Sequence, residues 1–551
     1  MSNKFPLGID SFEKLRAGNY YYIDKTAFIQ KLLESTFEVN LITRPRRFGK
    51  TLIMSMMEAF FNIEKNSKEN FQGLIISESS DLCDTWMNKW PTIFLTFKSV
   101  EGEDFESAYG MLTVLIADLC KKYDFLLQSP LVNAEDRAIF HSLMARKADA
   151  AEIKNSLYTL MRMLNAHYKK SVILLLDEYD VPLAHASEMG YYPQMLDLIR
   201  AILGKSLKSN EYLKFSVVTG CLKIAKESIF SGTNNFVSDT ITGDRFDEYF
   251  GFTEKDMEKL LADSELTDHM HEMREWYDGY RFGTVDVYCP WDVLNHASAL
   301  QSNPHKKPQN YWGATSHNSI IYRFISRDDI DVNDKFEILM DGNSIVEHVT
   351  EELTYDTIRS TEENLWSLLY LTGYLTRDQR EESGDNDGAV ALRIPNEEIR
   401  SLFKSAIIEW FNDTVRTTDR TMLFEALWNG NCDEASRRIS DILFSTISYH
   451  DYQESYYHAF IAGLFSGAGY IVESNYEYGT GRPDIVVKDK KNRRAIVIEI
   501  KNVKDLSALE KGCGAAIRQI REQEYTKKIE QDYRTVLCYG AAFYKKTCMI
   551  R

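Results

Sequence analysis

A short buried strand that leads directly into a glycine-lysine-threonine step and then into an apolar helix restricts the fold of this 551-residue chain more than any other segment. Residues 39–43 read Val-Asn-Leu-Ile-Thr and predict the strand, and residues 52–61 predict the helix. The loop between them, residues 44–51, reads Arg-Pro-Arg-Arg-Phe-Gly-Lys-Thr. Backbone amides of such a loop, together with the first turn of the helix, form a cradle for phosphate groups. The segment therefore predicts an α/β fold in which phosphate binds at the end of a strand.

The loop between the predicted strand and helix assigns chemistry to individual side chains. A strand, a loop ending in Gly-Lys-Thr and a helix form the P-loop arrangement, which binds nucleoside triphosphates. We expect Lys50 to reach the β- and γ-phosphates of ATP and the Thr51 hydroxyl to ligate Mg²⁺. Arg44 stands where the usual pattern has its first glycine, so the geometry of the loop stays open. The predicted nucleotide-binding residues of the loop are Arg46, Arg47, Gly49, Lys50 and Thr51.

A second apolar run ends in two acids. Residues 172–176 are consecutive large aliphatic residues, which favours a central parallel strand covered on both faces. Asp177 and Glu178 follow at its carboxyl end, where we expect Asp177 to support Mg²⁺ and Glu178 to polarise the attacking water. A buried strand followed by an acidic turn would have the same sequence, but the P-loop about 120 residues upstream favours an ATPase.

A further strand, predicted over residues 213–218, ends next to Thr219. Thr219 is placed like a sensor of the γ-phosphate, although a threonine at the end of a strand is also common without such a role. The alternation of buried strands and helices between residues 36 and 250 predicts a parallel α/β sheet. Weaker candidates for phosphate contacts are Lys223, Lys226 and Arg245.

A predicted β-hairpin near the carboxyl end gathers charged residues. Residues 484–501 contain two runs rich in β-branched residues around a polar, turn-like centre. If the hairpin is symmetric, Asp484 lies opposite Glu499, and Glu499 shares a face of its strand with Lys501. Two carboxylates can hold a divalent cation, and a lysine beside them can stabilise charge on a phosphate. Such residues also occur by chance on exposed hairpins, but the apolar run at 495–500 indicates a buried strand, in which charges require a partner or a metal.

Asp484, Glu499 and Lys501 resemble the Asp and Glu-x-Lys of the PD-(D/E)xK nuclease superfamily. Over nearly its whole length, the chain resembles bacterial AAA-ATPase-like proteins that carry a C-terminal PD-(D/E)xK nuclease domain. This resemblance implies an ATPase fused to a nuclease. The arginine-rich loop is typical of the family, so the arginine at position 44 in place of a glycine is compatible with an active nucleotide site. The segments that carry it are residues 22–26, 44–51, 225–232, 249–253, 276–283, 290–291, 371–375 and 394–396.

The resemblance to nucleases adds two residues to the predicted site. Related nucleases often complete the metal site with an acid of the first helix, and Glu454, which opens a predicted amphipathic helix, is the matching residue. A surface pair between Glu454 and His458, one turn later, explains the same spacing. Gln519 is either a polar residue near the site or an ordinary surface glutamine. The basic residues 488–494, together with Lys501, Lys504 and Lys511, form either a nucleic-acid contact or a solvated hairpin tip.

The length of the chain predicts two or three domains. We divide it into an AAA-ATPase-like P-loop domain with an N-terminal lead-in at residues 1–253, a mainly helical lid or connector at 254–430, and a restriction-endonuclease-like α/β domain of the PD-(D/E)xK type at 431–551. No apolar run is long enough to cross a bilayer and no signal-peptide core is present, so we expect a cytoplasmic protein with no membrane partner. The eight cysteines lack zinc-binding spacing and are expected to be reduced thiols.

These patterns predict a protein that binds and hydrolyses ATP and whose nuclease domain cleaves phosphodiester bonds with Mg²⁺ or Mn²⁺. DNA as the substrate follows from the resemblance. The family has no settled biological role, and we add defence against foreign DNA as an expectation. The net charge of -17 argues against broad nucleic-acid binding but leaves room for a local basic channel. The alternative is an ATP-driven switch or signalling module whose nuclease fold binds nucleic acid without cutting, and in either case we expect a homo-oligomer. The predicted metal ligands are Thr51, Asp177, Glu454, Asp484 and Glu499, and the predicted catalytic residues are Glu178, Asp484, Glu499 and Lys501.

Overall fold

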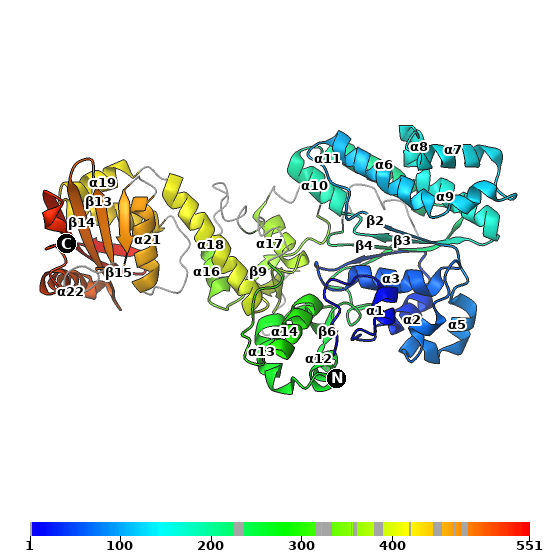
Figure 1. The fold of residues 1–551 in the computed structure, drawn as a ribbon, viewed down its shortest axis with the longest axis horizontal. Helices are drawn as coiled ribbons and strands as arrows, with labels where there is room; N and C mark the ends of the chain where they lie inside the picture. The colour runs from blue at the N-terminus through cyan, green and yellow to red at the C-terminus, as the bar shows by residue number, and fades with distance from the viewer. Residues whose placement is uncertain are drawn as a thin grey trace. The chain divides into compact units, whose positions relative to one another are not determined.

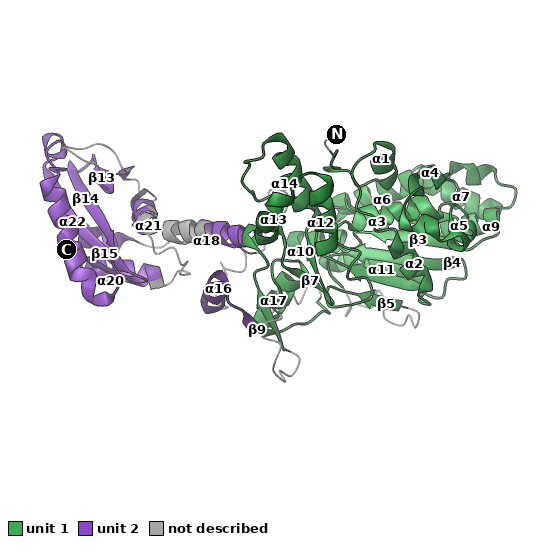
Figure 2. Ribbon diagram, turned by 90° about the horizontal axis from the view of Figure 1, so that it is seen from below, with its two compact units in different colours: residues 1–315, 346–399 green, residues 316–345, 400–551 purple. Residues whose placement is uncertain are grey.

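A computed structural model of the chain contains two compact units, which Figure 2 shows in different colours. The first unit comprises Met1–Thr315 and Val346–Ile399, and the second comprises Ser316–Ile345 and Arg400–Arg551. The middle region expected from the sequence is therefore divided between both units. The residues that the structure describes are 3–223, 236–313, 321, 333–353, 355, 361–378, 389–417, 420–444, 454–466, 470–474 and 483–551.

A five-stranded parallel sheet forms the centre of the first unit (Figure 1). Its order, β2-β3-β4-β1-β5, places β4 between the strand before the P-loop and the strand that ends in Asp177. All residues of β1 and β3 are buried, as their apolar sequences predict. Because the strands are parallel, their carboxyl ends meet at one edge of the sheet. The strands are β1 (Val39–Thr43), β2 (Thr92–Thr96), β3 (Val172–Asp177), β4 (Leu213–Gly220) and β5 (Phe236–Asp239).

Helices cover both faces of this sheet. In Figure 1, α6, α9 and α11 lie on one face, and α1, α2 and α3 lie on the other. Buried apolar residues such as Leu112, Leu160 and Ile199 join the first group of helices to the sheet in one core. The helices are α1 (Phe12–Ala17), α2 (Ala27–Glu34), α3 (Lys50–Phe61), α4 (Lys68–Phe71), α5 (Ser80–Trp86), α6 (Phe105–Lys121), α7 (Ala134–Met144), α8 (Ala150–Lys154), α9 (Ser156–Tyr168), α10 (Val181–Met189) and α11 (Tyr192–Leu207).

The rest of the first unit is mainly helical and also contains two small sheets, with the orders β6-β8-β7 and β10-β11-β9. Leu260, Tyr277 and Val293 belong to one core that joins three of its helices. The helices are α12 (Glu254–Asp263), α13 (Met270–Tyr277), α14 (Pro290–Ser302) and α17 (Glu362–Leu371). The strands are β6 (Phe252–Thr253), β7 (Tyr280–Phe282), β8 (Val285–Tyr288), β9 (Ile345–His348), β10 (Thr376–Arg377) and β11 (Ala389–Arg393).

The second unit contains a mixed sheet of order β12-β13-β14-β15-β16, in which only the described pair β14 and β15 is parallel. Side chains of a strand alternate between its faces, so Ile496 and Ile498 pack on one side with α19 to α21, whereas Val497 packs on the other side with α22. This mixed sheet agrees with the predicted restriction-endonuclease-like α/β domain. The helices are α16 (Asn333–Met340), α18 (Glu397–Thr417), α19 (Thr421–Trp428), α20 (Cys432–Phe444), α21 (Glu454–Ser466) and α22 (Leu509–Glu522), and the strands are β12 (Ile471–Ser474), β13 (Ile485–Asp489), β14 (Arg494–Asn502), β15 (Thr535–Tyr544) and β16 (Thr547–Ile550). Across both units, no helix among the described residues is long and apolar enough to span a bilayer.

Candidate active sites

The P-loop connects β1 to α3 at the carboxyl edge of the parallel sheet. Gly49 adopts a φ of +83°, a left-handed conformation that glycine takes without strain, and it caps the first turn of α3. Arg47 also has a positive φ, of +72°, which is unusual for a residue with a side chain. The ammonium of Lys50 is buried and donates hydrogen bonds of 2.9 Å to the carbonyl oxygens of Arg44 and Pro45. The lysine that we expect to bind phosphate is therefore held inside the loop.

Three of the predicted nucleotide-site residues contact one another through Asp177. The Thr51 hydroxyl donates to one carboxylate oxygen of Asp177 at 2.8 Å, and the Thr219 hydroxyl donates to the other at 2.6 Å. Asp177 is fully buried at the end of β3. A hydroxyl and a carboxylate oxygen at this separation form the hard oxygen set that Mg²⁺ prefers, so Thr51 and Asp177 fit a magnesium site. Residues 51, 177 and 219 come from different elements, and the strand order brings them together.

Glu178, the predicted base, follows Asp177 in a left-handed conformation with a φ of +53°. Burial raises the pKa of its carboxyl group, and the nearby Lys50 opposes this shift. A raised pKa brings a carboxylate closer to the range in which it accepts protons efficiently at neutral pH. The position and environment of Glu178 are thus compatible with the role expected from the sequence, which stays a prediction.

Asp180 is a buried residue of this site that the sequence reasoning missed. One of its carboxylate oxygens accepts hydrogen bonds from the backbone amides of Cys221 and Leu222, at 2.9 and 3.0 Å. Gly220 leaves room for this carboxylate, because a Cβ atom there would lie 2.6 Å from the other oxygen of Asp180. Asp180 therefore fixes the segment after β4 beside Thr219. The clustering of three acids within residues 177–180 was the available signal.

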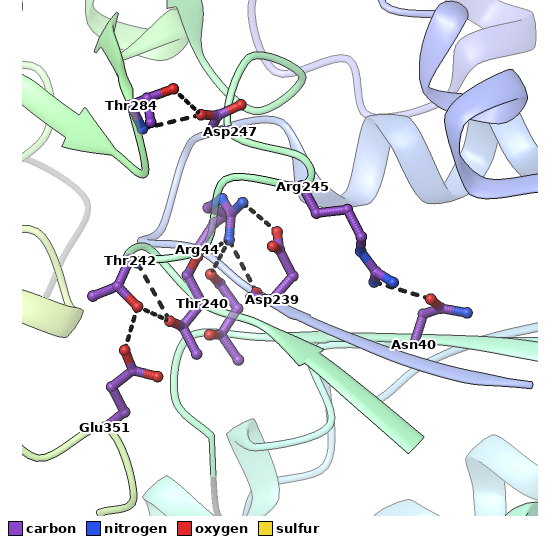
Figure 3. Close-up of polar contacts among 10 residues, drawn as sticks. Asn40, Arg44, Asp239, Thr240, Thr242, Arg245, Asp247, Thr284 and Glu351 are labelled. Atoms are coloured by element: carbon purple, nitrogen blue, oxygen red, sulfur yellow. Dashed lines mark hydrogen bonds and ion pairs between the residues drawn. The ribbon is translucent and has the colours of Figure 1, made fainter. Parts of the chain in front are cut away.

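Arg44, at the position of the usual first glycine, serves as a buried anchor for the loop (Figure 3). Its guanidinium lies 2.6 Å from the Asp239 carboxylate and donates to the carbonyl oxygens of Asp239 and Thr240 at 3.0 and 2.7 Å. The rings of Phe250 and Phe282 lie 5.2 and 5.3 Å from it. Burial lowers the pKa of Arg44 and Asp239 opposes the shift. The guanidinium thus ties the end of β1 to the end of β5, which answers the question of loop geometry that the sequence left open.

The other predicted phosphate contacts have different outcomes. Arg46 is exposed on the loop, whereas the guanidinium of Arg47 lies 4.2 Å above the ring of Trp291. Lys223 forms a 3.3 Å ion pair with Glu352. The suggestion that Arg245 contacts phosphate is wrong for this structure, because its guanidinium donates to the side chain of Asn40 in the first half of β1, away from the P-loop end. Lys226, and with it the 225–232 segment of the family resemblance, lies outside the described residues.

A segment of the middle region lies at the same edge of the parallel sheet. Glu351 accepts a hydrogen bond from Thr242, which follows β5, and Glu352 pairs with Lys223, which follows β4. The Tyr355 carbonyl accepts a 3.5 Å hydrogen bond from Ser187. These contacts connect the region after β9 to the strand ends that carry the nucleotide-site residues.

The second site lies where the hairpin of β13 and β14 opens. Ile485 pairs with Ile498, so Asp484 lies opposite Glu499, and the register predicted from the symmetry of the hairpin is confirmed. The Asp484 carboxylate accepts a 2.7 Å hydrogen bond from the amide of Ile500. The Lys501 ammonium donates to the Glu499 carboxylate at 3.0 Å. Asp484, Glu499 and Lys501 therefore stand together at one end of the hairpin.

The environment of Glu499 suits a metal ligand. Its side chain is 2% exposed, and burial together with the nearby Asp484 raises the pKa of its carboxyl group. A divalent cation would relieve both effects, because it offsets the two negative charges. Among the described residues, no group of three or more His, Cys, Asp and Glu side chains converges on one point. A metal held by Asp484 and Glu499 would therefore complete its coordination with water, substrate or a backbone carbonyl.

The remaining predicted residues of the nuclease site are placed as follows. Glu454 is the first residue of α21, but its side chain lies outside the described residues. His458 has its Nε2 atom 2.6 Å from the carbonyl oxygen of Asp484, so it contacts the backbone of a predicted ligand, a role that the sequence did not suggest. Gln519 contacts the hydroxyl of Tyr525 at 3.5 Å. The predicted roles of Glu454 and Gln519 stay untested.

The basic hairpin tip does not form one patch with Lys501. Lys488 pairs with Glu473 at 2.6 Å, and Arg494 pairs with Asp489 at 2.8 Å. Asp489 is five residues along β13 from Asp484, which corresponds to roughly 17 Å of extended strand. The tip and the carboxylate cluster therefore lie at opposite ends of the hairpin, and a nucleic-acid contact that includes both stays a prediction.

Two segments of the chain match known families. Residues 6–230 match the family described as Predicted AAA-ATPase, and residues 452–551 match the PD-(D/E)XK nuclease superfamily. A protein from Azotobacter chroococcum mcd 1, described as an uncharacterized protein in the vnfD 5'region, is 25% identical over 554 residues. That similarity covers 98% of this chain and 96% of the relative, so it extends over both matched segments.

Proposed function

We propose that this protein binds and hydrolyses ATP and cleaves phosphodiester bonds in DNA. The proposal rests on the two matched regions of the chain, one to the family described as Predicted AAA-ATPase and one to the PD-(D/E)XK nuclease superfamily. One observation carries the proposal: at each of two sites, the side chains that the chemistry would use lie together, Thr51 with Asp177 and Asp484 with Glu499 and Lys501. DNA as the substrate belongs to the proposal through the family resemblance. Defence against foreign DNA, a cytoplasmic location and assembly into a homo-oligomer are further parts of the proposal.

In the ATPase half, Lys50 leaves the carbonyl oxygens of Arg44 and Pro45 and neutralises the β- and γ-phosphates. Thr51 and Asp177 hold Mg²⁺, and Thr219 orients the Asp177 carboxylate through its 2.6 Å hydrogen bond. Glu178 accepts a proton from the attacking water, which its raised pKa favours.

In the nuclease half, Asp484 and Glu499 would hold Mg²⁺ or Mn²⁺, which would supply a polarised water and neutralise charge on the scissile phosphate. Lys501, 3.0 Å from Glu499 and only partly exposed, orients that water or stabilises the charge that develops on the phosphate. The amide of Ile500 fixes the Asp484 carboxylate, so the ligand set is preorganised.

The test is cleavage of labelled single- and double-stranded DNA with Mg²⁺ or Mn²⁺, in the presence and absence of ATP. We compare the wild type with Lys501→Ala and with Lys488→Ala. Lys488 also pairs with a glutamate, Glu473 of β12, but it lies at the other end of the hairpin. Cleavage by the wild type and Lys488→Ala, but not by Lys501→Ala, supports the proposal. No cleavage by any of the three, combined with ATP-dependent retention of DNA, would favour the switch that binds without cutting.

A further inference from the structure

The amino-terminal edge of the parallel sheet carries an aromatic and basic surface that neither active site uses. It lies opposite the nucleotide site, because parallel strands begin at one edge of a sheet and end at the other. We call it the basic aromatic edge and define it as Trp86, Lys89, Trp90, Lys170 and Lys214. The first three precede β2, Lys170 precedes β3, and Lys214 is the second residue of β4.

Direct contacts join these residues into one surface. The rings of Trp86 and Trp90 are stacked, with centroids 5.1 Å apart and planes inclined by 28°. The Lys214 ammonium lies 4.9 Å from the Trp90 centroid and 5.5 Å from that of Trp86. The Lys170 ammonium lies 5.5 Å from Trp90 and donates a 2.9 Å hydrogen bond to the carbonyl of Lys89. Both indoles are partly exposed, so rings and ammonium groups together reach solvent.

The surface continues along the same edge past the start of β3. The amide of Val172 donates a 2.7 Å hydrogen bond to the carbonyl of Tyr212. The Tyr212 ring lies 5.6 Å from that of Tyr158, and the Lys205 ammonium lies 4.7 Å above the Tyr158 ring. Alternating rings and lysines thus extend over the starts of three neighbouring strands.

The charge of this edge contrasts with that of the chain. The whole protein has a net charge of -17, yet no carboxylate of a described residue lies within ion-pairing distance of Lys89, Lys170, Lys205 or Lys214. Glu211 is the acidic residue next to Tyr212. Trp86 also lines a pocket of about 520 Å³ together with the acidic residues Glu34, Glu78 and Asp81. These ammonium groups therefore have no described counter-charge that a phosphate would have to displace.

We propose that the basic aromatic edge binds a single strand of nucleic acid. Lysines contact successive phosphates, and the partly exposed rings offer apolar faces to unstacked bases, the combination by which proteins hold single strands without reading their sequence. The inference is independent of the nuclease site, because it assigns nucleic-acid binding to the ATPase unit itself. An anionic membrane would match the charge, but the stacked indoles among the lysines favour bases as the partner.

The test is fluorescence anisotropy of a labelled oligothymidylate with the full chain, in chelator so that no cleavage occurs. The test variant combines Lys89→Gln, Lys170→Gln and Lys214→Gln. The control combines Lys147→Gln, Lys255→Gln and Lys259→Gln, which are exposed lysines that change the net charge equally. We expect at least a tenfold loss of affinity in the test variant only. The slope of log affinity against log salt should fall by about two, since each single-strand phosphate contact contributes about 0.7.

Two further arms identify the partner and the surface. A photo-cross-linking residue placed at position 214 should attach to the oligonucleotide in the wild-type background and in Lys501→Ala, which separates this surface from the nuclease site. Vesicles of anionic phospholipid should not bind. Equal affinities and salt slopes for the test and control variants, or binding to the vesicles but not to the oligonucleotide, would overturn the proposal.

Discussion

The guanidinium of Arg44 lies 2.6 Å from the carboxylate of Asp239, and both side chains are almost completely buried. Arg44 follows β1 and Asp239 ends β5, so this ion pair joins the start of the P-loop to the neighbouring strand. Arg44 is also the first residue of the loop, and its backbone carbonyl accepts a hydrogen bond from Lys50. The buried pair therefore holds the part of the loop on which the phosphate-binding lysine rests.

Removing the partner of Arg44 should destabilise the first unit strongly. Asp239→Ala leaves a buried guanidinium without its counter-charge, which costs about 3–5 kcal/mol in comparable buried pairs. The matched control is Asp197→Ala, which removes the partner of Lys154 in an exposed pair and should cost less than about 1 kcal/mol. Urea unfolding of the two variants measures the difference. Similar losses in both would show that Arg44 tolerates the lack of its partner.

Two variants at the nucleotide site should separate binding from hydrolysis. Lys50→Ala removes the lysine that we expect to bind the β- and γ-phosphates, and we expect it to abolish ATP binding. Glu178→Gln keeps Lys50, Thr51 and Asp177 and should retain ATP while hydrolysis falls about 10²–10⁴-fold. Equilibrium binding of a fluorescent ATP analogue and phosphate release distinguish them. Full hydrolysis by Glu178→Gln would exclude this residue as the base.

Replacing Asp484 with asparagine should preserve the fold but weaken metal binding. An asparagine side-chain oxygen can still accept the hydrogen bond from the amide of Ile500, whereas it removes one of two negative charges. Replacing a residue that only supports a metal ligand lowers metal affinity about 10–100-fold, and we expect the loss of Mn²⁺ affinity in this variant to be greater. The unfolding midpoint should change little. Calorimetric titration with Mn²⁺ measures the first and thermal unfolding the second. Unchanged Mn²⁺ affinity would remove Asp484 from the ligand set.

A buried pair of acids behind the P-loop predicts a pH dependence of stability. Burial and the nearby Asp292 raise the pKa of Glu398 to about 10, and burial raises that of Asp292 to about 6. Between the ordinary pKa of a glutamate and the raised pKa of Glu398, the folded protein therefore keeps a proton on this group, whereas the unfolded chain has released it. The contribution of Glu398 to the free energy of unfolding is complete at low pH and is lost as the pH rises toward 10, by up to about 1.4 kcal/mol per pH unit.

Glu398→Gln isolates this effect, because the amide oxygen can still accept from the backbone amides of Tyr311 and Trp312. Between pH 6.5 and 8.5, the free energy of unfolding should fall more steeply for the wild type than for Glu398→Gln. The control is Glu258→Gln, an exposed glutamate of α12, which should follow the wild type. Parallel curves for all three proteins would mean that Glu398 is ionised in the folded state.

Much of the local structure could be predicted from the sequence. The strand at 39–43, the helix after the P-loop and the register of the hairpin depend on residues close in the chain, and the structure agrees with each. Hydrophobic period and turn symmetry carry this information, since they describe which face of an element is buried. The sequence did not place Arg245 correctly, because a position shortly after a strand does not reveal toward which end of the sheet the side chain points. In the structure its guanidinium donates to Asn40.

The sequence by itself determined the elements, the two clusters of chemical groups and the pairing of Asp484 with Glu499. Only the tertiary structure decided that Thr219 and Thr51 share Asp177, that Arg44 meets Asp239 at a sequence separation of 195, and that lysines before β2, β3 and β4 form one surface. These relationships follow from the strand order β2-β3-β4-β1-β5. Strand order is set by the packing of distant segments into one core, and the local period of a strand does not contain it.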